Sequence, residues 1–249
     1  MRFKTFCGLI RWSFEEYLRF PMIEIVIAIA IIGVLTQTTV NVYFHSNYEI
    51  LPQATFLLFM FLTCSICAIF ARGFARSNSK GEDKLLLSYP LKRWHLFTSK
   101  FISLFGTLII VFFTACSMHI YLALLSPFEP MFYVGLLSLV FQVLLSAAVT
   151  ITISLFTKNE AVAILSSILL LIGVESAAGF GNYLSAQGRL GYINAYFSRF
   201  VRPDKVPIYE SLFNPTKTGV IVVMAIPLVI SLVLLIVSYV YFTRFMEID

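Results

Sequence analysis

Residues 131–157 read MFYVGLLSLVFQVLLSAAVTITISLFT, and none of these side chains carries a charge. As a helix rising about 1.5 Å per residue the run is about 40 Å long, more than the hydrocarbon core of a bilayer at about 30 Å. Only short polar segments, SPFEP before it and TKNE after it, separate it from two further apolar runs. The three runs therefore predict consecutive membrane-spanning helices joined as antiparallel hairpins.

The rest of the chain continues this pattern, with 59% hydrophobic and 12% charged residues among 249. A soluble domain has about 25% charged residues, so we expect an all-α integral membrane protein. No segment is large enough for a separate soluble module, and residues 1–249 are interpreted as one domain. We expect six spans, with both termini on the same side, at 22–44, 51–71, 101–126, 131–157, 161–180 and 219–243.

The distribution of basic residues predicts the orientation. With a cytoplasmic N-terminus, thirteen of the eighteen lysines and arginines lie in cytoplasmic segments, and the other five lie in the outer loop 181–218. Cytoplasmic loops are enriched in basic residues, so both termini are expected to be cytoplasmic in a multi-pass protein of the cell membrane. Anionic lipid attracts basic residues beside spans, which makes lipid the expected partner and excludes nucleic acid.

The N-terminal segment 1–21 predicts an amphipathic helix. Its apolar side chains fall within an arc of about 120° at 100° per residue, and Pro21 ends the helix before the first span. Such a helix is expected to lie in the inner membrane interface. The residues of the arc are Phe3, Phe6, Cys7, Ile10, Phe14, Tyr17 and Leu18.

The outer loop 181–218 contains Tyr192, Tyr196 and Phe200 at intervals of four residues. This spacing predicts a helix with an aromatic face, too short to cross the bilayer and therefore interfacial or re-entrant. An aromatic anchor resting on lipid and a contact with substrate both remain open.

Residues that carry covalent chemistry are not grouped in the sequence. No glycine is followed by lysine, so the chain lacks the loop that holds ATP phosphates, and we expect it to bind no cofactor. The histidines His45, His95 and His119 have no metal-ligand spacing. FEEYLR at 14–19 departs from the motif of CAAX-type membrane proteases by one intervening residue. We therefore expect no catalytic or metal residues. An intramembrane enzyme and a gradient-driven transporter or channel remain open as functions.

Two ionisable residues fall within predicted spans at similar depth. His119 lies seven residues from the outer end of its span, and Glu175 lies five from its own. Small residues around Glu175, in GVESAAG, favour close helix packing. We hypothesise that the two side chains share a polar site in the outer half of the bundle, as an interhelical hydrogen bond or a substrate contact.

The cytoplasmic loop 72–100 contains GEDKLLLSYPLKRWHLFTSKF at 81–101. Gly81 can end the helix of the second span, and Glu82 and Asp83 suit the first turn of a new short helix. Leu85, Leu86 and Tyr89 would share its apolar side. Pro90 favours a break, after which Leu91 and the residues that follow it begin a helix that continues into the third span.

These features together resemble the permeases of the type-2 ABC export family. The family segment commonly has leucines, a polar residue, proline and basic residues, then a lysine at the start of span three, matched here by Leu85, Leu86, Leu87, Ser88, Pro90, Lys92, Arg93 and Lys100. Many members carry a large outer domain after span one, whereas this chain has only HSNYEI, which leaves the substrate class open.

The resemblance implies a transport subunit that is not itself an enzyme. The short helix would be a coupling helix that docks on a cytoplasmic ABC ATPase, which binds ATP and Mg, and the permease would pair with a second copy or a similar permease. The apolar lining fits export of a hydrophobic or amphipathic molecule. The expected ATPase-coupling residues are Glu82, Leu85, Leu86, Ser88, Tyr89, Pro90, Leu91 and Arg93.

Overall fold

The structure is a computed structural model, and nearly all of the residues it describes are helical, with none in a β-strand. It describes residues 3–17, 62–79, 81–88, 91–122, 130–157, 159–177, 184–201 and 215–245, and six positions between 24 and 35. The elements, with π-helical turns labelled η, are α1 (Phe3–Tyr17), η2 (Arg72–Arg76), α4 (Ser77–Ser79), α5 (Glu82–Leu87), α6 (Arg93–Leu122), α7 (Pro130–Thr157), α8 (Glu160–Ala177), α9 (Ala186–Val201), α11 (Lys217–Val240) and η4 (Tyr241–Phe245).

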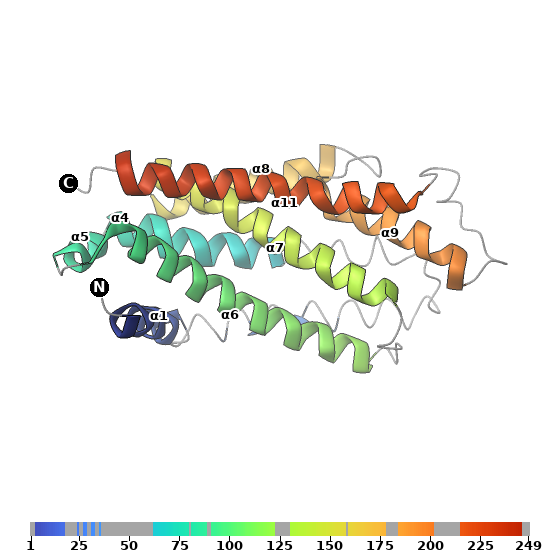
Figure 1. Cartoon of the computed structure of the whole chain (residues 1–249), viewed down its shortest axis with the longest axis horizontal. Coiled ribbons are helices and arrows are strands. Elements are labelled where there is room, and N and C mark those ends of the chain that lie inside the picture. The colour runs from blue at the N-terminus through green and yellow to red at the C-terminus, as the bar shows by residue number, and fades with distance from the viewer. Residues whose placement is uncertain are drawn as a thin grey trace.

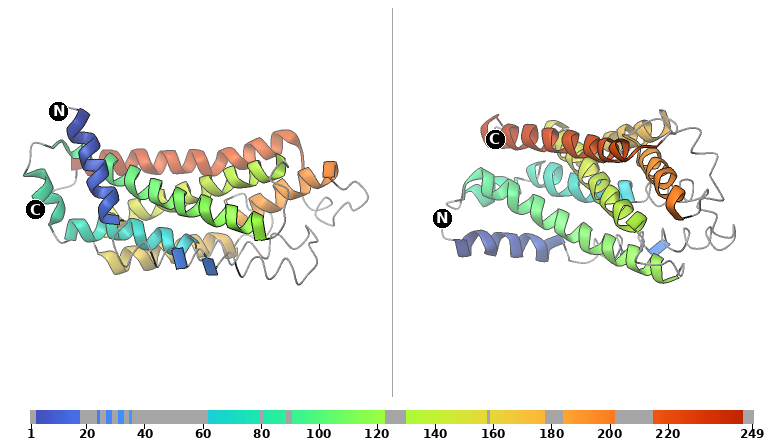
Figure 2. Two further views of the ribbon diagram at one scale, coloured as in Figure 1. Left: turned by 90° about the horizontal axis from the view of Figure 1, so that it is seen from below. Right: turned by 45° about the vertical axis from the view of Figure 1, so that its right-hand side comes forward.

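The long helices run side by side, and α7 is the central one, in contact with α6, α8, α9, α11 and η2 (Figure 1). Helix α1 lies across their direction at one end, as Figure 2 shows in its left view. The described part of the chain begins and ends at that end, where α1, α5 and η4 lie, while α9 lies toward the opposite end.

The membrane-spanning character predicted from composition is confirmed for part of the chain. Within the described ranges, three stretches are long and apolar enough to cross a bilayer: Arg93–Val111, Val140–Thr157 and Lys217–Phe245. Helix α8 has 18 residues, about 27 Å at 1.5 Å per residue. The predicted first span, 22–44, lies almost wholly outside the described residues, as does the first half of the second, 51–71.

Local chemistry explains where these helices begin. Pro130 opens α7, where its missing N–H costs no hydrogen bond. The side chain of Asn159 accepts from Val162 N at 3.3 Å ahead of α8, and Thr216 Oγ1 accepts from Gly219 N at 3.0 Å ahead of α11. Such N-caps satisfy amides that have no partner within the helix.

The centre of α7 carries small side chains that allow close helix approach. In lipid, helix association depends on packing and interhelical hydrogen bonds rather than on exclusion of water. Thr150 Oγ1 donates to the thiol of Cys67, at 3.4 Å, and Thr152 pairs with Ser238 of α11 at 2.9 Å. Where the structure describes the burial of α7 side chains, those with no exposed surface are Ser146, Ala147, Ala148, Thr150, Ile151 and Ser154.

An aromatic cluster fills the core at the α5 end. The Phe97 ring of α6 lies 5.4 Å from the Phe74 ring of η2 and 5.6 Å from the Phe242 ring of η4, measured between centroids. All three side chains are buried. The cluster therefore holds both π-helical turns against α6.

Candidate functional site

The short helix α5 forms as the sequence predicts. Gly81 adopts a positive φ of 71°, which glycine reaches without steric cost, and its carbonyl accepts from Leu85 N at 3.1 Å. Glu82 and Asp83 occupy the first turn, where the helix dipole favours negative charge. Gly81 thus separates α5 from the helix that ends at Ser79.

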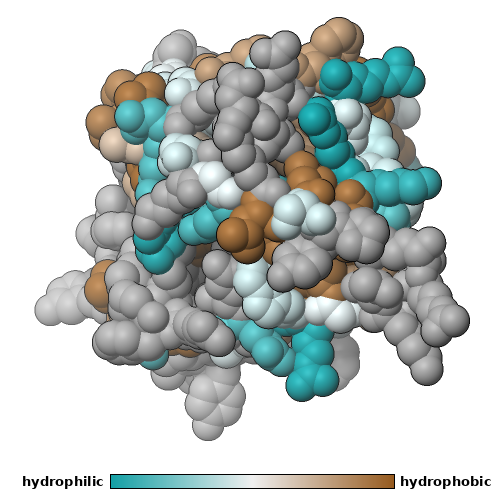
Figure 3. Space-filling model, turned by 90° about the vertical axis from the view of Figure 1, so that its left-hand side faces the viewer, coloured by the Kyte–Doolittle hydropathy of each residue, from teal (hydrophilic) through white to brown (hydrophobic). Residues whose placement is uncertain are grey.

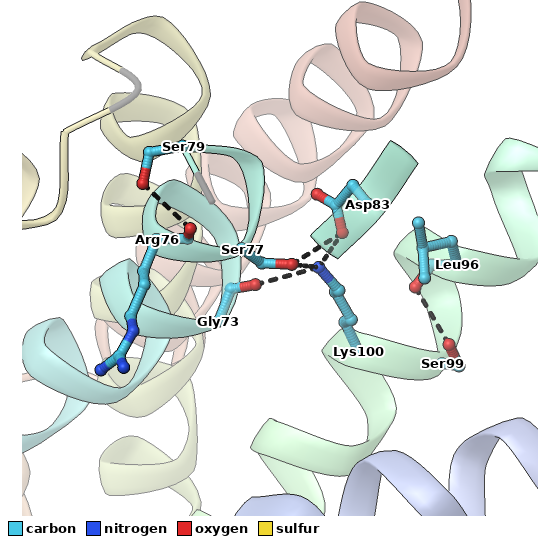
Figure 4. Close-up of polar contacts among 8 residues, drawn as sticks. All are labelled: Gly73, Arg76, Ser77, Ser79, Asp83, Leu96, Ser99 and Lys100. Atoms are coloured by element: carbon cyan, nitrogen blue, oxygen red, sulfur yellow. Dashed lines mark hydrogen bonds and ion pairs between the residues drawn. The ribbon is translucent and has the colours of Figure 1, made fainter. Parts of the chain in front are cut away.

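Four residues tie α5 to the bundle, and we call them the Lys100 network: Gly73, Ser77, Asp83 and Lys100 (Figure 4). Lys100 Nζ donates to Gly73 O at 3.2 Å, to Ser77 Oγ at 2.6 Å and to Asp83 Oδ1. Ser77 Oγ in turn donates to Asp83 Oδ1 at 2.7 Å. The network therefore joins η2, α4, α5 and α6.

The network is almost completely removed from solvent. The side chains of Lys100 and Asp83 are 5% and 2% exposed. An ammonium has three N–H donors, and each finds an acceptor here. A buried ion pair with its hydrogen bonds satisfied is costly to break, since removing one partner leaves a buried charge uncompensated. This arrangement fixes the position of α5.

The π-helical turn η2 supplies part of the network. In an α-helix, Ser77 N–H would donate to the carbonyl four residues earlier, that of Gly73. Here it donates to Phe74 O, and Gly73 O accepts from Lys100. The irregular turn thus places a backbone carbonyl toward the ammonium.

The face of α5 away from the network is exposed. Leu85 is 67% exposed, whereas Leu86 packs partly buried against the main core cluster. The two leucines therefore point differently, because neighbouring helical residues are about 100° apart. Glu82 and Ser88 are also exposed, and Ser88 Oγ donates to Leu85 O at 2.7 Å.

The remaining predicted coupling residues are only partly described. Leu91 and Arg93 are partly buried at the start of α6, and Tyr89 and Pro90 lie outside the described residues. The end face that carries α5 shows hydrophilic side chains around a smaller hydrophobic area (Figure 3). Leu85 supplies part of the apolar surface available at this end.

Helix α1 packs beside the same site. The Phe6 ring lies 5.5 Å from the His95 ring, which stacks on Trp94 at 3.7 Å. Ser103 Oγ donates to Ile10 O at 3.0 Å. Part of the apolar face predicted for lipid therefore contacts α6, while Cys7 and Trp12 are exposed.

A second buried polar group lies near α9; we call Gln142, Glu175 and Arg189 the Arg189 network. Arg189 is 0% exposed and donates to Gln142 Oε1 and, at 2.7 Å, to Leu184 O. Glu175 Oε1 accepts from Ala186 N at 2.6 Å. Burial lowers the pKa of Arg189 to about 10, although the charge of Glu175 acts to raise this pKa. Arg189 therefore stays charged at pH 7.

The predicted pairing of His119 with Glu175 stays a prediction. His119 lies on α6, but its side chain is outside the described residues. Glu175 instead contacts the beginning of α9. Sequence reasoning missed Arg189, and the available signal was Gln142, the only side-chain amide in a charge-free run of apolar and hydroxyl-bearing residues.

The aromatic face predicted in the outer loop is partly internal. Tyr192 is 4% exposed, and its hydroxyl accepts from Thr216 N at 3.1 Å ahead of α11. This tyrosine therefore packs against protein rather than lipid. Tyr196 and Phe197 are less buried, and the side chain of Phe200 lies outside the described residues.

Comparison of the chain with protein-family models, with curated proteins and with solved structures found no match. Among the described residues, no group of three or more histidines, cysteines, aspartates or glutamates could hold a metal ion. The functional interpretation therefore depends on the Lys100 network, the exposed α5 surface and the Arg189 network.

Proposed function

We propose that this chain is the transmembrane permease subunit of an ATP-driven ABC exporter. It would form the substrate path with a second copy or a similar permease, and ATP and Mg would bind to a separate cytoplasmic ATPase. The proposal includes six spans, cytoplasmic termini and α5 as the coupling helix.

One observation carries the proposal: α5 is a short helix held at the end of the bundle by buried polar contacts, with an apolar side chain outward. Lys100 fixes its position by three hydrogen bonds, and Leu85 is 67% exposed. A helix fixed between two spans transmits displacement better than a flexible loop does. An exposed leucine on such a helix suits a hydrophobic groove on a partner.

The end of the bundle at which the described chain begins and finishes agrees with the proposed orientation. The described chain begins with α1 and finishes with η4 at the end that also carries α5. If this end faces the cytoplasm, as the basic residues predict, α5 is accessible to a cytoplasmic ATPase.

The test is purification of the tagged chain from its native membranes, with mass spectrometry of the proteins that accompany it. We expect an ATPase with a complete phosphate loop in stoichiometric amount. Leu85→Gln should reduce its recovery. Phe245→Gln is the matched control, because Phe245 of η4 is 68% exposed at the same end of the bundle but lies on another helix. Equal recovery with both variants would contradict docking through Leu85.

A second candidate function is gradient-driven transport, favoured by the Arg189 network. Buried charged residues in membrane proteins often belong to ion or proton pathways. This function would operate without an ATPase. Liposomes that contain the purified chain alone would then carry current or solute under an ion gradient, whereas the ABC proposal expects no such flux.

A further inference from the structure

We infer that Lys100 is a positioning residue that holds η2 in its π-helical register, so that displacement of α5 is converted into rotation of residues 62–71. The inference rests on the proposed function, because it requires a partner that moves α5. Lys100 touches neither substrate nor ATP in this scheme; it acts through the elements it joins.

The first step is the connection itself. Asp83 of α5 and Gly73 O of η2 are bound by one ammonium, and Ser77 bridges them. All of these groups are buried. Separating a buried ion from its partner strongly destabilises the folded protein. Helix α5 therefore cannot move far without moving the Lys100 network or breaking it.

The second step is the alternative register of η2. A π-helical turn holds one residue more than an α-helical turn, and such turns often occur at functional sites. Conversion of η2 to an α-helix would return the Ser77 N–H to Gly73 O, the carbonyl that Lys100 now binds. Because one residue then no longer belongs to the wider turn, the conversion rotates the preceding segment by about 100° about the helix axis and shifts it along the axis by about 1.5 Å.

On the side that faces α8, the contacts of η2 and α4 are weak. An open pocket of about 490 Å³ lies beside α4, lined by Ser79 and by Asn159, Glu160, Ala161 and Ile164. Arg76 of η2 reaches Glu160 only at 3.9 Å, with both side chains about one-third exposed. A partly exposed ion pair of this kind contributes little stability, so it opposes movement weakly.

Cys64 reports on the rotation. It lies half-buried in the helix before η2, and Cys67 of the same helix is buried against Thr150. Rotation of residues 62–71 would change the exposure of Cys64 and hence its rate of reaction with a maleimide. Cys7 and Cys116 are replaced by serine so that labelling at Cys64 can be followed by peptide mass spectrometry.

The experiment compares the Cys64 labelling rate with ATP and with ADP in the complex of permease and copurified ATPase. We expect the two rates to differ by about fivefold or more, the range of ordinary coupling between sites. Lys100→Met should bring the ratio to unity while the ATPase is still recovered, and Lys100→Arg, which keeps the charge, should restore much of the difference. Lys217→Met, an exposed lysine at the start of α11, is the control.

Each outcome separates the two proposals. If no ATPase accompanies the unchanged chain, the proposed function fails and the inference fails with it. If the ATPase is present but Lys100→Met leaves the ratio unchanged, only the inference is overturned. Should Lys100→Met fail to fold or lose the ATPase, Ser77→Ala decides: it keeps the ion pair and removes one bridge, so a reduced ratio supports the inference and an unchanged ratio overturns it.

Discussion

Lys100 and Asp83 form an ion pair across 17 residues of sequence, with both side chains nearly inaccessible to solvent. The pair links the beginning of a long apolar helix to a helix of only six residues. It explains why a segment too short to be stable in isolation has a defined position at the end of the bundle.

The first prediction concerns the energy of this pair. Lys100→Met should lower the free energy of unfolding by about 3–5 kcal/mol, since it leaves Asp83 buried without its partner. The double variant Lys100→Met/Asp83→Asn should be less destabilised than the sum of the single variants, because no buried charge remains. Apparent melting temperatures in detergent measure this; simple additivity would contradict the pairing.

The second prediction concerns Arg189. Arg189→Met should destabilise the protein by about 3 kcal/mol or more, because Gln142 and Leu184 O lose a charged donor in a buried site. Arg11→Met is the control, since Arg11 is exposed and pairs with the exposed Glu15 on its own helix. The same assay should show no measurable change for Arg11. Similar effects of the two substitutions would argue against a structural role for the Arg189 network.

The third prediction tests the contact between α9 and α11. A Cβ atom at Gly219 would lie 2.7 Å from Cζ of Tyr192, too close for any real contact, so Gly219→Ala should cost about 1–3 kcal/mol. Gly106→Ala is the matched control, because its Cβ would meet nothing within 4 Å. Hydrogen exchange should show faster opening of α9 in the first variant alone. Unaltered exchange in α9 would mean that Tyr192 does not pack there.

The fourth prediction concerns orientation. Cys7 is exposed on α1, so in a chain whose other cysteines are replaced by serine, an impermeant maleimide should label it in inside-out vesicles only. Labelling in right-side-out vesicles would reverse the proposed topology and place α5 on the outer side, where no cytoplasmic ATPase could reach it.

Helices whose ends are determined by neighbouring residues could be predicted from the sequence. The charge-free run 131–157 predicts α7 to within one residue at its start, because polar residues bound it on both sides. Gly81 and the two acids after it predict the break and the start of α5 in the same way. Each of these signals lies within a few residues of the structure that it determines.

Contacts between distant segments could not be predicted. Gln142 and Arg189 are 47 residues apart, and their pairing depends on how α7 and α9 are rotated about their axes. The same is true of Leu85 and Leu86: the sequence indicates an apolar side of α5, but the Lys100 network determines which leucine is exposed. The spacing of apolar residues alone does not specify how a helix is rotated about its axis relative to its neighbours.

Photocrosslinking from position 85 tests the docking surface most directly. A photoreactive amino acid replaces Leu85 in the native membrane. Leu169, an exposed leucine of α8 inside the predicted span 161–180, is the negative control. We expect the probe at position 85 to crosslink to an ATPase with a complete phosphate loop and the probe at position 169 not to do so. If position 85 crosslinks only to lipid, or to nothing, while an ATPase copurifies with the chain, α5 is not the coupling helix.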